Sequence, residues 1–394
     1  MHHGLFVGQA GMGMIMTAWM RNERSCARTR VAARTLAGLL ASLLAACGGG
    51  SDQSPDPVVL DVAIAYVKRP IPVDNQGAVE PSDVRELRTF NIGADLFVRE
   101  RAAVSAAEIN VTNRITQGGG LYDVRDLEMA YDGSKVLFAM RGPFVQGAQE
   151  EDQPTWNIWE YTLATDTLRR IITSDLTAGA GHDVAPHFLP DGRIIFSSTR
   201  QRQSKAVLLD EGKPQFDAQD EDRNEPAFVL HVMNADGSDL HQVSFNQSHD
   251  LDPTVLSNGQ VVFSRWDNAS GVNEINLYRM NPDGTALELF YGAESHNTGT
   301  NAATLQFVQP REMPDGRILT IARPFQTDEA GGDLVAIDAQ NFVENLQPTA
   351  PNVGALTGPA QSRVVANDVR TDDSISPGGE FTSAYPLFDG TNRM

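Results

Sequence analysis

Residues 186–200 read PHFLPDGRIIFSSTR, a stretch with the pattern of a β-hairpin. Asp191-Gly192 is a two-residue turn of the kind that requires positive φ, and the β-branched and aromatic residues after it predict a short strand. The same arrangement recurs at Asp132-Gly133, Asn258-Gly259 and Asp315-Gly316, and a further turn dipeptide stands at Asp389-Gly390. Because the turns are 57 to 74 residues apart, the sequence predicts a chain of similar units.

A second pair of strands follows each of these turns. It is seen in FVLHVMNADGSDLHQVS from Phe228, in NLYRMNPDGTALELF from Asn276 and in DLVAIDAQNF from Asp333. Two hairpins form a four-stranded sheet, and radial repetition of such sheets protects their edges in β-propellers. The sequence therefore predicts an all-β fold, a β-propeller of four-stranded blades, with about five blades in residues 58–394.

The last unit is short, because only four residues follow Asp389-Gly390. YPLFDGTNRM precedes or enters a strand whose remaining partners are missing, and an unpaired edge strand is an aggregation hazard. We therefore expect a propeller that is incomplete at its C-terminal end, in a chain that is part of a longer gene product.

The units resemble the propeller repeats of TolB-type proteins, through PHFLPDGRIIFSSTR from Pro186 and LHVMNADGSDLHQVSFN from Leu230. Over a longer span, from IAYVKRPIP (Ile64) to HDLDPTVLSNGQVVFSRW (His249), the chain resembles the middle, propeller domain of the hydrazine synthase alpha subunit. This resemblance implies a fold and leaves the function open, because propellers host binders, scaffolds and enzymes. The c-type haems of that subunit are held by C-x-x-C-H motifs, and this chain has none.

The first 46 residues are predicted to be a signal segment. From Met20, five arginines precede twelve mostly apolar residues, 35–46, as in the charged and hydrophobic regions of an export signal. Twelve residues are too few to cross a hydrocarbon core of about 30 Å. Residues 20–46 are thus predicted to be a lipoprotein signal peptide, and residues 1–19 an over-extended start outside the fold.

Leu44-Ala45-Ala46-Cys47 matches the lipobox of bacterial lipoprotein signals, which implies cleavage before Cys47 and lipid attachment to it. Residues 47–57 are rich in Gly and Ser and predict a flexible tether. Gly48, by resemblance to lipoprotein sorting rules, implies an outer-membrane protein facing the periplasm, so the membrane is a predicted partner through the lipid anchor. An ordinary secretory signal or a short buried helix are the alternatives.

Charge and cysteine content exclude several function classes. The chain has 394 residues with 31 Lys and Arg against 51 Asp and Glu, a net charge of −20 that disfavours nucleic acid as a partner. The other cysteine, Cys26, lies in the signal segment, so the body has no thiol for disulfides, thiolate metal sites or covalent haem. No cofactor is expected.

Candidate ligand residues come from two equivalent places in the repeat. His182-Asp183 and His249-Asp250 occupy the same place in their units. In each pair the His stands nine residues and the Asp eight residues before the turn, where the chain enters the innermost strand of a blade. Two imidazoles and two carboxylates at one mouth of the central channel could hold a cation or a polar ligand. The alternative is that each side chain caps a turn by bonding nearby backbone amides.

Two functional classes remain. The chain contains neither the G-x-S-x-G of a hydrolase nor a zinc-binding histidine spacing, so the sequence assigns no catalytic residue and favours a non-enzymatic role. The favoured prediction is a lipid-anchored propeller of the bacterial envelope that binds a protein or a small ligand at the channel mouth. The alternative is the propeller portion of a larger exported oxidoreductase, with its cofactor motifs outside this chain.

Overall fold

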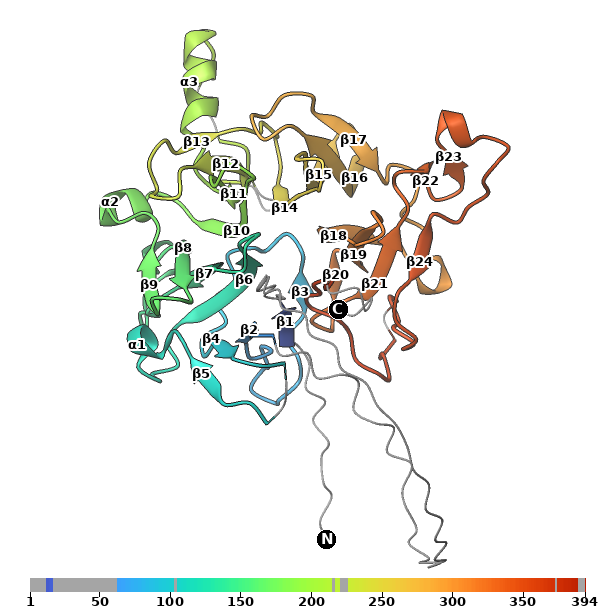
Figure 1. Cartoon of the computed structure of the whole chain (residues 1–394). Helices are drawn as coiled ribbons and strands as arrows, with labels where there is room; N and C mark the ends of the chain where they lie inside the picture. Colours follow the sequence, from blue (N-terminus) through green and yellow to red (C-terminus); the bar gives the residue numbers. More distant parts are fainter. Residues whose placement is uncertain are drawn as a thin grey trace, which may run out of the picture.

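The computed structural model describes residues 12–16, 62–102, 105–214, 217–219, 226–372, 374–388 and 394. Five four-stranded antiparallel sheets stand in a ring around a central channel (Figure 1). The prediction of an all-β propeller with about five four-stranded blades is confirmed.

The strands of each blade follow one another from the channel outward. The first blade contains β1 (Met12–Met16), β2 (Ile64–Lys68), β4 (Asp95–Arg99) and β5 (Glu108–Asn110). The second contains β6 (Asp123–Met129), β7 (Lys135–Arg141), β8 (Asn157–Thr162) and β9 (Thr167–Arg170). The third contains β10 (Asp183–Phe188), β11 (Ile194–Ser198), β12 (Val229–Met233) and β13 (His241–Gln242). The fourth contains β14 (Asp250–Val255), β15 (Val261–Ala269), β16 (Val272–Met280) and β17 (Glu288–Tyr291). The fifth contains β18 (Gln306–Glu312), β19 (Ile318–Arg323), β21 (Asp333–Ile337) and β24 (Gln361–Arg363).

Short elements decorate this ring. Two-stranded sheets pair β3 (Ser82–Asp83) with β20 (Gln326–Thr327), and β22 (Phe342–Glu344) with β23 (Gln347–Pro348). The α-helices are α1 (Asn113–Thr116), α2 (Asp175–Ala178) and α3 (Arg202–Asp210), which projects from the rim (Figure 1). The 3-10 helices span Glu150–Asp152, Thr300–Ala302 and Ala350–Asn352. Among the described residues, no helix is long and apolar enough to cross a membrane.

The predicted turns join the innermost strand of a blade to the second strand. Gly133, Gly192, Gly259 and Gly316 all have φ between +70° and +87°, in the left-handed region that glycine adopts at little cost. Neighbouring strands of a blade are antiparallel. β11, for example, pairs with β10 on one side and with β12 on the other. The glycine-containing turns predicted from the sequence therefore connect each strand that lines the channel to the next strand of its blade.

Apolar side chains fill the interfaces between consecutive blades. Four clusters of buried residues join the first blade to the second, and so on to the fifth; Phe138, Phe196, Phe263 and Phe307 represent them. A further cluster packs Leu87, from the segment after β2, against buried side chains of the second to fifth blades. The fifth blade is joined to the segment after β2 by the β3–β20 sheet.

Three features of the structure were not expected from the sequence. The fourth strand of the fifth blade is β24, not the Asn341-Phe342 end of the predicted pair, because the chain first forms the separate β22–β23 hairpin. Residues 382–388 form no strand, although YPLFDG predicts one; the place beside β2 is taken by β1, and these residues lie in the channel instead. β1 itself comes from within residues 1–19, which the sequence-based prediction places outside the fold. Cleavage before Cys47 would remove β1 and leave β2 as the innermost strand of the first blade.

Several predictions concern residues that the structure does not describe. The lipobox with Cys47, the tether 47–57, nearly all of the signal segment 1–46 and the turn Asp389-Gly390 lie outside the described residues. Lipid attachment at Cys47 and an incomplete C-terminal end therefore stay predictions.

Candidate functional site

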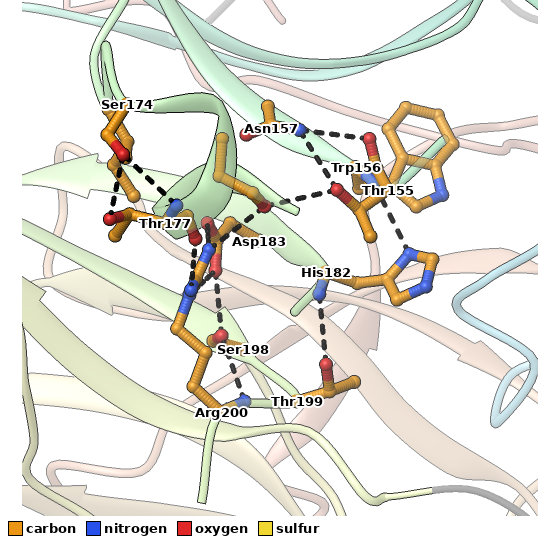
Figure 2. Close-up of polar contacts among 12 residues, drawn as sticks. Thr155, Trp156, Asn157, Ser174, Thr177, His182, Asp183, Ser198, Thr199 and Arg200 are labelled. Carbon is orange, nitrogen blue, oxygen red and sulfur yellow. Dashed lines mark hydrogen bonds and ion pairs between the residues drawn. The ribbon is translucent and has the colours of Figure 1, made fainter. Parts of the chain in front are cut away.

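The two predicted histidines occupy equivalent places at the start of neighbouring innermost strands. His182 Nδ1 accepts a hydrogen bond from the Trp156 amide at 3.3 Å (Figure 2), and His249 Nδ1 accepts one from the Phe228 amide at 3.0 Å. Burial lowers the pKa of His249 to about 3 and that of His182 well below its ordinary value. Both imidazoles are therefore neutral at physiological pH and bond backbone amides.

The two predicted carboxylates are buried and accept hydrogen bonds from side chains. Asp183 holds both its oxygens against Arg200, at 2.9 and 2.8 Å, and accepts a third hydrogen bond from Ser198 Oγ (Figure 2). Asp250 accepts hydrogen bonds from Ser244 and Asn246, with Arg265 Nε 3.6 Å away. Burial raises the pKa of Asp183, and it raises that of Asp250 to about 6.

The two imidazoles bond backbone amides, as in the capping alternative, whereas the two carboxylates bond side chains. The structure brings His182 and Asp183 into one polar network and gives His249 and Asp250 the same place in the next blade. Within the part of the chain that the structure describes, no group of three or more His, Cys, Asp or Glu side chains could hold a metal ion. A ligand-binding role for the four residues stays a prediction.

A second set of equivalent residues lines the middle of the channel. Asp126, Ala185, Asp252 and Gln309 each stand six residues before the turn of their blade, at a bulge in the innermost strand. All four have φ between +49° and +57°, a conformation that is unusual for residues other than glycine. They line a cavity of about 210 Å³.

This cavity presents charges of both signs. Besides the two aspartates, its walls include Arg69, Arg125 and Arg311. Arg69 forms a bidentate ion pair with Asp123, with both distances 2.8 Å. Arg69 directly follows β2 of the first blade, Arg125 lies in the second blade, and Arg311 lies in the fifth.

Two groups in the cavity are incompletely paired. Asp252 accepts one hydrogen bond among the described residues, from the Gln309 amide at 3.2 Å. Burial, assisted by the negative charge of Asp126, raises its pKa to about 6. Arg125 donates through Nη2 to the Leu87 carbonyl, and its Nε lies 3.3 Å from Asp126 Oδ2 in an ion pair. This buried Nε has no acceptor in hydrogen-bond geometry within the described parts of the chain. A buried polar atom of this kind is costly and calls for an explanation.

A second layer of polar side chains lies two residues further along each innermost strand. Glu128 forms an ion pair with Arg311, and its Oε1 lies 3.3 Å from His187 Nε2. Glu128, His187 and Arg311 line another cavity of about 400 Å³. Burial lowers the pKa of His187, so Glu128 is paired by Arg311 at neutral pH.

The predicted channel mouth is covered by the segment after β2. Pro70, Ser82, Leu87 and neighbouring residues line a third cavity of about 320 Å³, which shares Arg69, Arg125 and the two channel aspartates with the middle one. The loop reaches across to the fifth blade, where the Val84 amide donates to the Phe325 carbonyl at 3.0 Å. The channel residues, not the predicted His-Asp pairs, therefore form the cavity in which a ligand would fit.

Sequence reasoning missed these channel residues. Asp, Ala, Asp and Gln share no side-chain chemistry, so their equivalence is not visible as a motif. A signal was nevertheless present, because Pro follows directly at 186, 253 and 310, inside a predicted strand. Pro in a strand interior indicates a bulge or an edge.

Comparisons with known proteins agree with the fold. No protein family profile matches the chain, and no curated protein matches it. Among solved structures, hydrazine synthase from Kuenenia stuttgartiensis is similar with a TM-score of 0.52 and 16% identity, over 79% of this chain and 39% of that one. TolB from Acinetobacter baumannii has a TM-score of 0.34 and 11% identity, over 67% of this chain and 49% of that one. The chain therefore shares a β-propeller fold with part of hydrazine synthase, and the similarity shows the fold alone.

Proposed function

We propose that this chain is an exported, lipid-anchored protein of the bacterial envelope that binds a small polar ligand in its central channel. The observation that carries the proposal is the cavity of about 210 Å³ where Asp252 accepts a single hydrogen bond and Arg125 Nε, although ion-paired with Asp126, donates none among the described residues. Drug-sized ligands occupy pockets of roughly 300–1,000 Å³, so this one suits a smaller molecule.

The ligand class follows from the charges of the wall. Arg125 Nε, which is ion-paired with Asp126 but donates no hydrogen bond among the described residues, offers a donor for an acidic group. Asp252 offers an acceptor for a basic group. Hydrogen bonds between charged groups are about twice as strong as neutral ones, and more so in a confined site. A small molecule with both an acidic and a basic group, such as an amino acid or a dipeptide, would satisfy both.

Replacing Asp252 with asparagine is expected to stabilise the fold and to weaken ligand binding. The pKa of Asp252 is higher in the folded chain than its usual 3.8, so the folded state loses stability as the pH rises from about 4 through 6. Asp252→Asn keeps the acceptor for the Gln309 amide and removes this penalty, which predicts a gain of about 1–3 kcal/mol at pH 7. Chemical unfolding at pH 4 and pH 7 measures it.

Binding is measured by calorimetry with free amino acids and unblocked dipeptides. Wild-type protein is expected to bind at least one of them, and Asp252→Asn to bind it about 10-fold or more weakly, because a charged hydrogen bond contributes about 1.5–3 kcal/mol. Asp191→Asn, at an exposed turn, is the matched control and should bind like the wild type. No heat with any of these probes would overturn the proposed ligand class.

The proposed location has its own test. Cys47→Ser removes the predicted lipid attachment site, and the protein should move from the membrane fraction to the soluble fraction of the envelope. Fractionation followed by immunoblotting measures the change, with Cys26→Ser as the control that should stay with the membrane. Retention of Cys47→Ser on the membrane would contradict lipid anchoring.

The similarity to hydrazine synthase favours a second candidate. The chain spans 39% of the length of that protein, so it could be the propeller portion of a larger exported oxidoreductase whose cofactor motifs are encoded beyond Met394. An in-frame or frameshifted C-x-x-C-H in the DNA downstream, and a Soret band in the purified full-length product, would support this candidate. A stop codon with no such continuation would count against it.

A further inference from the structure

The fifth blade lacks a carboxylate that three other blades have at the first residue of the innermost strand. In the second, third and fourth blades this residue is Asp123, Asp183 and Asp250. Each of these aspartates forms an ion pair with an arginine, at 2.8, 2.8 and 3.6 Å; the arginines are Arg69, Arg200 and Arg265. Gln306 stands at this place in the fifth blade, so the side chain there is neutral.

Arg323 is the arginine that this difference leaves without an ion-pair partner. It stands opposite Gln306 at the end of β19, just as Arg265 stands opposite Asp250 in the fourth blade. Gln306 does not replace the missing charge, because its Oε1 accepts a hydrogen bond from the Ile275 amide at 2.6 Å. Arg323 is only 7% exposed, and it forms no ion pair among the described residues.

The guanidinium group of Arg323 is only partly hydrogen-bonded. Its Nη2 donates to the Ser82 carbonyl at 3.0 Å and to Ser82 Oγ at 2.8 Å. Its buried Nε has no acceptor within the described parts of the chain. Burial lowers the pKa of Arg323 to about 10, so the group still carries its charge at neutral pH. A buried cation of this kind is costly unless an anion compensates it.

The acidic groups near Arg323 are bonded to other partners. Asp83 accepts two hydrogen bonds from the Arg85 side chain, at 2.8 and 2.6 Å. Glu380 accepts one from the Gly331 amide at 3.0 Å. Both carboxyl groups attract Arg323, but neither forms an ion pair with it. The place of an anion beside Arg323 is therefore open to a ligand.

Arg323 and Arg125 line one cavity. It has a volume of about 320 Å³, lies under the segment after β2, and is also lined by Asp252. The segment holds one nitrogen of each guanidinium group, because the Leu87 carbonyl accepts from Arg125 Nη2 and Ser82 accepts from Arg323 Nη2. The Nε of each arginine donates no hydrogen bond among the described residues. The cavity thus offers two donors for acidic groups and one acceptor for a basic group.

We propose that Arg323 binds a second acidic group of the ligand, so that the channel takes an acidic amino acid or a dipeptide with one acidic side chain. This inference rests on the proposed function of the channel as the ligand site, and it narrows the ligand class. The ammonium group would bind Asp252, one carboxylate Arg125 and the other Arg323. Because Arg125 is already ion-paired with Asp126, Arg323 supplies the charge that selects the second carboxylate.

Calorimetry with two pairs of ligands tests this selection in the full chain. The pairs are glutamate with glutamine, and alanyl-glutamate with alanyl-glutamine; the members of a pair have nearly the same size and differ by one charge. The wild type is expected to bind the acidic member of at least one pair about 10-fold or more tightly, because hydrogen bonds between charged groups are the strong ones. Equal affinities within both pairs would overturn the inference and leave the proposed function standing. No binding of any of the four would overturn both.

Two variants assign the selection to Arg323. Arg323→Gln removes the cation, so the acidic and neutral members of a pair should bind equally. Gln306→Glu keeps the acceptor for the Ile275 amide and places opposite Arg323 the carboxylate that the other blades have, so it should also abolish the preference. A preference that persists in either variant would overturn the proposal.

Controls separate a change in selection from a loss of the fold. Arg317→Gln, in an exposed ion pair with Asp315 of the same blade, should bind all four ligands like the wild type. Thermal unfolding of each variant shows whether it is folded at the temperature of the titration. Gln306→Glu removes no buried cation, so it decides the question even if Arg323→Gln does not fold.

Discussion

Replacing Arg200 with alanine is expected to destabilise the protein by about 3–5 kcal/mol, because it leaves a buried carboxylate without its partner. Arg200 and Asp183 are almost completely buried, at 5% and 0% side-chain exposure, and form two parallel hydrogen bonds. Arg200 also donates to the Thr177 and Ala178 carbonyls of α2, in the connection between the second and third blades, so its loss breaks these bonds as well. Denaturant unfolding at pH 7, followed by circular dichroism, measures the loss.

Two further variants test the physical reason. Arg193→Ala removes an arginine of the same blade whose ion pair with Asp191 is exposed, and it should cost less than about 1 kcal/mol. Adding Asp183→Asn to Arg200→Ala should restore part of the lost stability, since no charge is then left buried. Equal losses for Arg193→Ala and Arg200→Ala would show that burial does not decide the contribution of these ion pairs.

Replacing Gly284 with alanine is expected to cost about 3 kcal/mol or more, through a clash with the neighbouring blade. Gly284 has φ +83°, where alanine is disfavoured by about 1–2 kcal/mol. A methyl group would also lie 2.1 Å from the Val243 carbonyl oxygen of the third blade. Relief of that overlap must move the β16–β17 turn away from the blade interface, and overpacking adds about 1–3 kcal/mol. Thermal and denaturant unfolding measure the combined effect.

Gly259 is the matched control for Gly284. Its φ is +85°, and a methyl group there would meet no atom within 4 Å. Gly259→Ala should therefore cost only about 1–2 kcal/mol, the conformational part alone. If the two variants lose the same stability, the contact between the fourth blade and Val243 contributes nothing.

The architecture was predictable because its causes are local. The turn dipeptides require positive φ wherever they stand, and alternating β-branched residues favour strands without regard to distant contacts. The equivalence of His182 and His249 also followed from spacing, and the structure gives both the same amide bond. Their neutral, bonded state did not follow from spacing, because it depends on the burial that the assembled ring imposes.

The channel site needed the tertiary structure. Asp126 lies in the second blade and Asp252 in the fourth, far apart in the sequence. The bulge that brings them into the channel is a backbone feature shared with Ala185 and Gln309. No sequence spacing indicates that these residues meet.

The amino-acid sequence by itself determined the repeat, the four-stranded unit and the place of the turns, since each rests on residues within a few positions of one another. The tertiary structure alone decided which charges are neutralised and which are left incompletely paired. Asp183 and Asp252 stand in adjacent blades, at similar distances before their turns, yet Arg200 reaches one and no arginine forms an ion pair with the other in the described parts of the chain. The physical reason is that burial and pairing depend on distances across the ring, which are fixed only when all five blades are packed together.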